Sequence, residues 1–248
     1  MYLIDTHTHL FLKEFEKDIE KVISRSIENK VKKLILPNID STSIIPLLNL
    51  CKKHKNICFP SIGLHPSSVK ENFKEELKIV ENYLKKEKFY FIGEIGIDLY
   101  WDKSFKKEQI FSFEKQIEFA EIYNLPIIIH MRNSYEEILK ILCKNSKKNL
   151  KGIFHCFSGN LKQAENIINL GFKLGIGGVL TFKNSGLDKV VKNISLENIV
   201  LETDSPYLAP HPKRGKRNES SFLIYIAEKI AEIKNINIKE VAEITSYY

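Results

Sequence analysis

The chain has 248 residues, of which 43% are hydrophobic and 28% are charged. This length and balance are typical of a globular protein with a buried core, and they argue against a disordered or fibrous chain. No apolar run is long enough to span a bilayer, and the first ten residues lack the pattern of a signal peptide. We therefore expect a cytoplasmic protein without a membrane segment, whose four cysteines are free thiols.

Lys and Arg outnumber Asp and Glu by 38 to 31, which gives a formal net charge of +7. An excess of this sign favours an anionic partner such as nucleic acid. A compositional bias toward Lys, Ile and Asn, such as an AT-rich genome produces, would create the same excess without selection for binding. The charge alone leaves both explanations open.

Short apolar runs rich in β-branched residues recur along the whole chain. They predict strands over 2–5, 33–36, 57–63, 89–94, 126–130, 152–155, 172–177 and 198–203. Apolar residues at helical spacing between the runs are clearest over 19–27, 113–122 and 223–233. The tail from Asn237 to Tyr248 is expected to form a final short helix.

A strand followed by a helix, repeated eight times, is the pattern of a parallel sheet closed into a barrel. We therefore predict an α/β fold, a single (β/α)8 TIM barrel of parallel strands that spans residues 1–248. A doubly wound open sheet is the alternative. Eight regular units without a glycine-rich phosphate loop favour the barrel.

Six histidine and carboxylate residues fall at the ends of predicted strands. They are His7, His9, Glu94, His130, His155 and Asp204. In a barrel these positions lie on the C-terminal rim, where active sites are built, and alternation along a strand turns His7 and His9 to one face and Thr8 to the other. One such histidine could simply cap a carbonyl. Six together indicate a metal site, because buried histidines and carboxylates are costly unless they are paired or coordinated.

Two further features follow the third and fourth predicted strands. His65 could contact a phosphate, or it could form a hydrogen bond in the turn before Pro66. Tyr100 and Trp101 could stack on nucleobases near a basic site, or they could pack a loop onto the barrel. Both pairs of interpretations stay open at this point.

Cationic residues near the predicted rim could bind a phosphate. Arg132 could do so through two parallel hydrogen bonds, or it could pair with Glu136 or Glu137. The loop after the eighth strand is stiffened by prolines and carries Lys213, Arg214, Lys216 and Arg217. Barrels often bind phosphate near the ends of strands seven and eight, so we predict substrate contacts for Arg214 and Arg217. An exposed basic turn without a ligand is the alternative.

The chain resembles the TatD family of metal-dependent deoxyribonucleases, within the wider superfamily of amidohydrolase-like barrels. The matching stretches are IDTHTHL (4–10), SIGLHP (61–66), IGEIGIDLYW (92–101), PIIIHMR (126–132), FHCFSG (154–159) and LETDSPYLAPHPKRGKRNE (201–219). Together they cover nearly the whole barrel. Related amidohydrolases usually place a carboxylated lysine at the position that bridges two metal ions, where this chain has Glu94.

The resemblance implies two divalent metal ions. One would be held by His7, His9, Glu94 and Asp204, and the other by Glu94, His130 and His155. A carboxylate has two oxygens and can bridge two ions, so Glu94 would be shared, and Asp204 would orient the attacking water as a general base. Histidine ligands suit zinc or manganese and oxygen ligands suit magnesium, so the identity of the metal stays open.

These features predict a divalent-metal-dependent hydrolase of phosphodiester bonds, acting on single-stranded or frayed DNA through a water activated by two metals. No obligate protein partner is expected. An amidohydrolase-like enzyme for a small amide, ester or phosphoester is the alternative, and neutralising Arg214 and Arg217 would separate the two. A nucleic-acid-binding module without catalysis is disfavoured, because binding alone would not require the ligand set.

Overall fold

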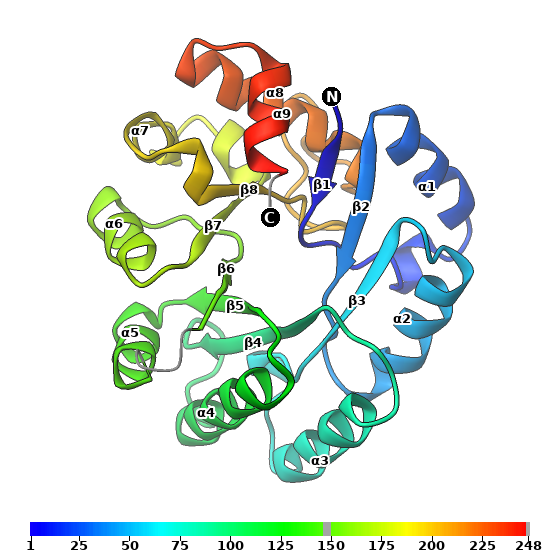
Figure 1. Ribbon diagram of the computed structural model, residues 1–248, viewed down its shortest axis with the longest axis vertical. Coiled ribbons are helices and arrows are strands. Elements are labelled where there is room, and N and C mark those ends of the chain that lie inside the picture. The colour runs from blue at the N-terminus through cyan, green and yellow to red at the C-terminus, as the bar shows by residue number, and fades with distance from the viewer. Residues whose placement is uncertain (146–149, 247–248) are drawn as a thin grey trace.

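In a computed structural model, which describes residues 1–145 and 150–246, eight parallel strands form one sheet in sequential order, ringed by helices (Figure 1). The strands are β1 (Leu3–Asp5), β2 (Val31–Leu36), β3 (Cys58–Ile62), β4 (Phe91–Asp98), β5 (Ile127–Arg132), β6 (Gly152–Phe154), β7 (Lys173–Ile176) and β8 (Ile199–Leu201). Each lies within or overlaps one of the predicted runs. The prediction of a (β/α)8 barrel is therefore confirmed.

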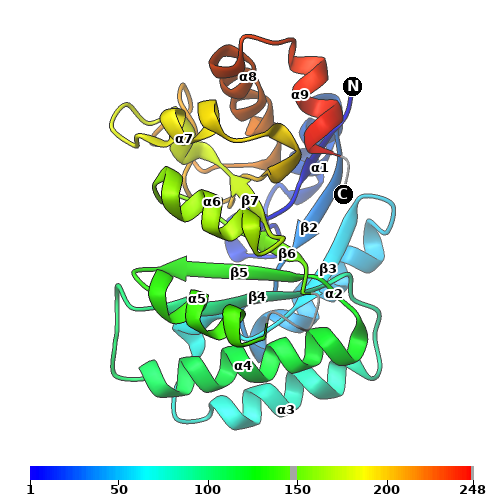
Figure 2. The same ribbon diagram turned by 60° about the vertical axis from the view of Figure 1, so that its left-hand side comes forward.

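A helix follows each strand on the outside of the barrel. The helices are α1 (Ile19–Glu28), α2 (Ser41–Lys53), α3 (Phe73–Leu84), α4 (Lys106–Tyr123), α5 (Tyr135–Lys144), α6 (Leu161–Asn169), α7 (Leu187–Asn193) and α8 (Leu223–Lys234). Figure 2 shows α4 and α5 along β4 and β5, with α3 next to α4. Across the described part of the chain, no helix has both the length and the apolar character that a membrane crossing requires.

The predicted tail helix is present as α9 (Ile238–Thr245). It begins after Asn237, whose side chain accepts a hydrogen bond from the backbone N–H of Lys239, as a helix N-cap does. Val241 and Ala242 are buried on the inner face of this helix, which packs against α8, β1 and β8. Residues 247–248 of the predicted helix lie outside the described residues.

The barrel closes between β8 and β1 through residues that lie just beyond the strands. The backbone N–H and the hydroxyl of Thr6 both donate to the carbonyl of Leu201, each at 3.0 Å. Further along, Thr8 and Ser205 form a parallel bridge, and their hydroxyl oxygens are 2.6 Å apart. The segments that follow β1 and β8, which carry His7 and Asp204, are thereby held side by side.

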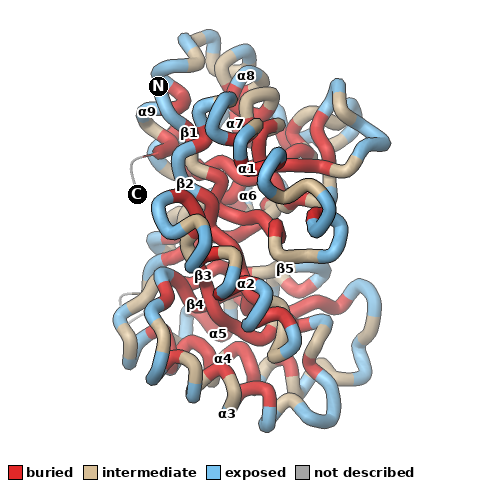
Figure 3. Tube along the Cα trace, turned by 90° about the vertical axis from the view of Figure 1, so that its right-hand side faces the viewer, coloured by how far each residue is buried: buried red, intermediate tan, exposed pale blue. Residues whose placement is uncertain are grey.

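The core continues through the strands, most of whose residues are buried, while the helices expose their outer faces (Figure 3). All eight residues of β4 are buried, because both faces of this strand are covered. The prediction ended this strand at Glu94, but it continues to Asp98, which pairs with Arg132 of β5. Glu94 therefore lies inside β4 rather than at its end, beside an irregularity in the β4–β5 register between Ile92 and Ile95.

Gly96 of β4 allows the backbones of β4 and β5 to approach closely. Its φ is +144°, and a Cβ placed there would lie 2.0 Å from the carbonyl oxygen of His130. We expect Gly96→Ala to lower the free energy of unfolding by about 3 kcal/mol or more, because strain and a backbone clash act together. Chemical denaturation measures the change.

Gly171 provides the matched control. Its φ is also positive, at +86°, but apart from the glycine and its two chain neighbours, no atom of the described residues lies within 4 Å of the position of a Cβ. Gly171→Ala should cost only about 1 kcal/mol, from the unfavourable φ alone. Equal losses in the two variants would contradict the proposed close approach.

Candidate active site

Two histidines just beyond β1 begin the site. The rings of His7 and His9 are buried, and their Nε2 atoms are 3.1 Å apart. The same atoms lie 3.1 and 3.7 Å from Oε2 of Glu94. As predicted from strand alternation, both rings point inward together, while Thr8 turns away toward Ser205.

The carboxylate of Glu94 is the centre of the site. While Oε2 faces the β1 histidines, Oε1 lies 2.8 Å from His130 Nδ1, 3.1 Å from His155 Nε2 and 3.3 Å from His65 Nε2. Burial alone would raise the pKa of Glu94, but the surrounding imidazoles outweigh it and hold that pKa well below its usual value. These surroundings therefore favour the ionised form of the carboxylate.

Asp204 follows β8 and completes the predicted set. Its Oδ1 lies 3.6 Å from His9 Nε2 and 3.8 Å from His7 Nε2, and its backbone N–H donates to the carbonyl of His7 at 2.9 Å. Its φ of +56° is in the left-handed region, which non-glycine residues adopt mainly at functional sites and turns. Burial acts to raise the pKa of Asp204, but contact with His9 and the charge of His155 hold it below its usual value.

The donor set fits divalent metal ions. Three overlapping groups bring their ligand atoms within 4.8 Å of one another, namely His7–His155–Asp204, His7–His9–Glu94 and His65–Glu94–His130. Clustered imidazole nitrogens and carboxylate oxygens are the usual ligands of zinc and similar ions. All six residues predicted as ligands are thus brought together, and His65 joins them. Their division between two ions stays a prediction.

Of the two interactions that the sequence position of His65 left open, the structure shows the turn hydrogen bond, and a phosphate contact stays a prediction. His65 Nδ1 accepts a hydrogen bond from the backbone N–H of Ser67 at 3.1 Å, in the turn that begins at Pro66. Its Nε2 faces Glu94 and His130. Since Nδ1 is an acceptor, Nε2 carries the hydrogen in the neutral ring and can donate it toward the site.

Two carboxylates that were not predicted from the sequence each contact a histidine of the candidate metal site, at the ring nitrogen that does not face Glu94. Asp98 Oδ2 lies 2.9 Å from His130 Nε2. Glu202 Oε1 lies 3.3 Å from His155 Nδ1 and accepts a 2.7 Å hydrogen bond from the backbone N–H of Cys156. Burial would lower the pKa of His155, but the charges of Glu94 and Glu202 raise it well above its usual value. Carboxylates behind ligating histidines typically fix ring orientation.

Asp5 is a third missed carboxylate, and it orders the backbone beneath the site. It accepts hydrogen bonds from the backbone N–H and the hydroxyl of Thr203, at 2.9 and 2.6 Å. Burial raises its pKa to about 7. Spacing along the chain could have indicated all three carboxylates, since each lies two or four residues from a predicted ligand: Asp5 before His7, Asp98 after Glu94, and Glu202 before Asp204.

Arg132 lies against two aromatic rings. Its guanidinium carbon is 4.0 Å from the ring centroid of Tyr100 and 5.2 Å from that of Trp101. Glu137, one of the partners considered from sequence, pairs instead with Lys106 at 2.6 Å. A phosphate contact by Arg132 stays a prediction.

The two arginines of the loop after β8 have partners within the protein. Arg217 forms a two-pronged ion pair with Asp18, both N–O distances being 2.8 Å. Arg214 lies over the ring of Phe182 at 3.9 Å and donates to the carbonyl of Ala209. Arg214 is exposed and Arg217 partly so, and their predicted contacts with substrate stay predictions. The loop is more firmly anchored than a free basic turn.

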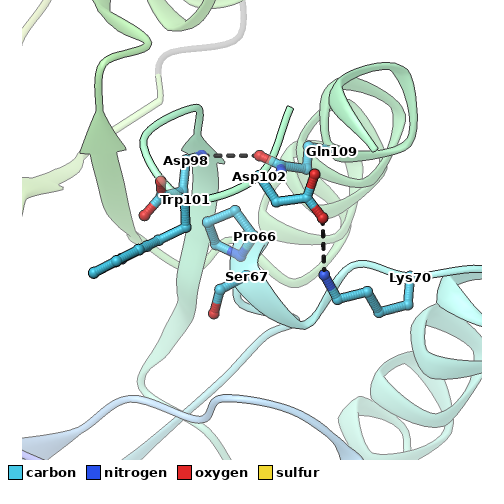
Figure 4. A pocket seen from close by; sticks show the side chains of 7 residues that line it. All are labelled: Pro66, Ser67, Lys70, Asp98, Trp101, Asp102 and Gln109. Atoms are coloured by element: carbon cyan, nitrogen blue, oxygen red, sulfur yellow. Dashed lines mark hydrogen bonds and ion pairs between the residues drawn. The ribbon is translucent and has the colours of Figure 1, made fainter. Parts of the chain in front are cut away.

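A small pocket adjoins the site between the turn after β3 and the end of β4 (Figure 4). It is lined by Pro66, Ser67, Lys70, Asp98, Trp101, Asp102 and Gln109. Gln109 accepts a 2.8 Å hydrogen bond from the backbone N–H of Asp98, and Lys70 lies 3.5 Å from Asp102. Trp101 is the most exposed aromatic residue around it.

A parallel barrel whose rim gathers histidines and carboxylates defines the class of barrel hydrolases that use metal ions. Residues 4–247 match the family described as TatD related DNase, and the chain belongs to this family. It is 39% identical over 245 residues to the uncharacterized metal-dependent hydrolase YabD of Bacillus subtilis, which covers 98% of this chain and 96% of YabD. It is 30% identical over 250 residues to the similarly described YcfH of Escherichia coli, with 99% and 93% covered.

A solved structure gives the same result. The crystal structure of YjjV, a TatD homolog from Escherichia coli, superposes with a TM-score of 0.92 at 27% sequence identity, covering 98% of this chain and 95% of that one. The family is thus one of metal-dependent hydrolases with this barrel.

Glu202 should control the affinity of the site for metal through His155. We expect Glu202→Gln to weaken zinc or manganese binding by about 10- to 100-fold, because the substitution removes the charge behind the ring and leaves its shape. Isothermal titration calorimetry measures the affinity. Glu165→Gln on the exposed face of α6 is the control, and unchanged affinity in Glu202→Gln would contradict the role of Glu202.

Metal binding should also depend on pH. A histidine must be neutral to bind a metal ion, whereas Glu94 and Glu202 favour the protonated form of His155. An entering ion therefore displaces a proton, and its apparent affinity should rise as the pH rises through the neutral range. Calorimetry in two buffers of different ionisation enthalpy should detect the released proton, and identical heats in both buffers would contradict the prediction.

Proposed function

We propose that this protein hydrolyses phosphodiester bonds of DNA, in single strands or frayed ends, with two divalent metal ions. The observation that carries the proposal is the position of the buried Glu94 carboxylate among one histidine of β5 and three that follow β1, β3 and β6. Membership of a family described as TatD related DNase supports a nucleic-acid substrate. Magnesium, manganese and zinc are all compatible with the mixed nitrogen and oxygen ligands.

The two oxygens of Glu94 support a shared role. Oε2 faces His7 and His9, and Oε1 faces His130 and His155. One ion would be held by His7, His9, Glu94 and Asp204, and the other by Glu94, His130 and His155. When bound, such ions make a water acidic and neutralise the charge of a phosphodiester.

The protein's own groups would move the proton and position the phosphate. Asp204 is ionised and partly accessible, with 16% of its side chain exposed, so it can take a proton from the attacking water as the general base. His65 can donate from Nε2 to a phosphate oxygen placed near Glu94, because its Nδ1 is already bonded to Ser67. Arg132, Arg214 and Arg217 would bind the flanking backbone.

Loss of the general base should abolish most of the activity. We expect wild-type protein with magnesium, manganese or zinc to cleave an end-labelled single-stranded oligodeoxynucleotide. Asp204→Ala and His155→Ala should each lower the rate by about 100-fold or more, as measured on denaturing gels. Glu165→Gln is the control, and thermal melting verifies that the variants fold.

An inert wild-type protein with all three metals, or undiminished cleavage by both variants, would contradict metal-dependent DNA hydrolysis at this site.

The engagement of Arg217 with Asp18 favours a second candidate, hydrolysis of a small phosphoester, ester or amide. A long polyanion would gain from free cations in this loop, whereas a small substrate would not need them. Comparing an oligonucleotide with thymidine 5′-p-nitrophenyl phosphate separates the two. Arg214→Ala should slow hydrolysis of the oligonucleotide more than that of the small diester if the substrate is DNA, and equal effects would favour a small substrate.

A further inference from the structure

The end of β4 presents two exposed aromatic rings to solvent. Trp101 is 73% exposed and Tyr100 is 53% exposed. Their ring centroids are 4.8 Å apart with planes at 88°, so the rings meet edge to face, and most of the Trp101 side chain stays exposed. Large aromatic rings contribute most when they are buried. Two neighbouring rings left open beside a catalytic rim therefore indicate a binding surface.

Arg132 adds a positive charge to this surface. Its guanidinium lies over the Tyr100 ring at 4.0 Å and near the Trp101 ring at 5.2 Å. Arg132 and Asp98 are paired in the register of β4 and β5, so the surface is built at the ends of two adjacent strands. We call Tyr100, Trp101 and Arg132 together the aromatic platform.

The platform is joined to the candidate metal site by three successive contacts. Glu94 Oε1 lies 2.8 Å from His130 Nδ1, and His130 Nε2 lies 2.9 Å from Asp98 Oδ2. Asp98 Oδ1 in turn accepts a 2.9 Å hydrogen bond from the backbone N–H of Tyr100. The network that orients a candidate metal ligand therefore also fixes the position of the platform.

We propose that the aromatic platform stacks on the base of a nucleotide next to the phosphate that metal ions at Glu94 would hold. This inference rests on the proposed phosphodiesterase function and names the feature of the substrate that the site recognises. Nucleobases stack on aromatic rings and on guanidinium planes, and a single strand offers them unpaired. The platform therefore selects unpaired nucleotides with little preference for sequence, because every base has a face that can stack.

The place of Trp101 in the site supports this occupant. Figure 4 shows the indole next to Pro66 and Ser67, across the pocket from Lys70 and Asp102. On the side of the pocket the indole of Trp101 therefore lies against protein. Only its exposed surface is left for a ligand. Arg132 also offers a cation to a phosphate beside the stacked base. If a partner protein covered these rings, the contacts that connect them to the metal site through Asp98 and His130 would not be needed.

Trp101 is the only tryptophan of the chain, so its fluorescence reports directly on the platform. We expect a single-stranded oligodeoxynucleotide to quench this fluorescence in the presence of chelator, where no cleavage occurs. An abasic oligomer of the same length and charge should quench it several-fold less. Tyr90→Ala, at the opposite end of β4, is the matched aromatic control and should leave the quenching unchanged.

Kinetics provide the second measurement. Trp101→Ala should raise the KM for a single-stranded oligonucleotide by about tenfold, the effect of losing one stacked base, and Trp101→Phe should restore most of the affinity. The penalty of Trp101→Ala should be several-fold smaller on an oligonucleotide that lacks the base beside the cleaved bond. Equal penalties on both substrates would overturn the platform.

The two proposals fail in different ways. Cleavage of DNA without quenching that depends on bases refutes the platform and leaves the phosphodiesterase intact. Base-dependent quenching without cleavage by any of the metals refutes the phosphodiesterase and retains a nucleotide-binding surface. A platform occupied by a protein would show equal quenching by the intact and the abasic oligomer, or none, and that result also overturns the inference.

Discussion

The structure depends on one buried carboxylate. An ionised Glu94 inside the barrel would be strongly unfavourable on its own, and histidines from four separate strand–helix units offset that cost. His7 follows β1, His65 follows β3, His130 lies in β5 and His155 follows β6. Because each ring comes from a different unit, the interaction forms only when the barrel has closed in its correct register. A shift of one residue in the register of a strand would turn its histidine ring to the opposite face of the sheet.

A second layer of acidic groups surrounds this centre and links it to the backbone. Asp98 lies behind His130, and Glu202 lies behind His155, so two of the rings have a carboxylate on each side. Asp5 performs a related task beneath the site by bonding to Thr203, which joins the ends of β1 and β8. Buried ionisable groups add little to the stability of a fold. Their role here is to hold the candidate metal ligands in fixed positions.

Ion pairs within the protein engage charged residues of the loop after β8, so these charges stabilise the fold. Arg217 pairs with Asp18, and Arg25 of α1 forms a two-pronged pair with Glu219 at the end of the same loop. These contacts tie the last strand of the barrel to the first helix, next to the β8–β1 closure. The net charge of +7 is therefore a poor measure of the charge that is free to meet a substrate.

By itself the sequence determined the alternation of eight strands with helices and the residues at the rim, because both are local patterns and strand ends in a barrel share one edge. It could not show that β4 continues to Asp98, since that extension depends on pairing with β5. Nor could it show that His65 reaches Glu94, or that Arg217 meets Asp18 across 199 positions of chain. Only the tertiary structure decided these contacts, because side chains distant in sequence become neighbours through packing, which local pattern does not record.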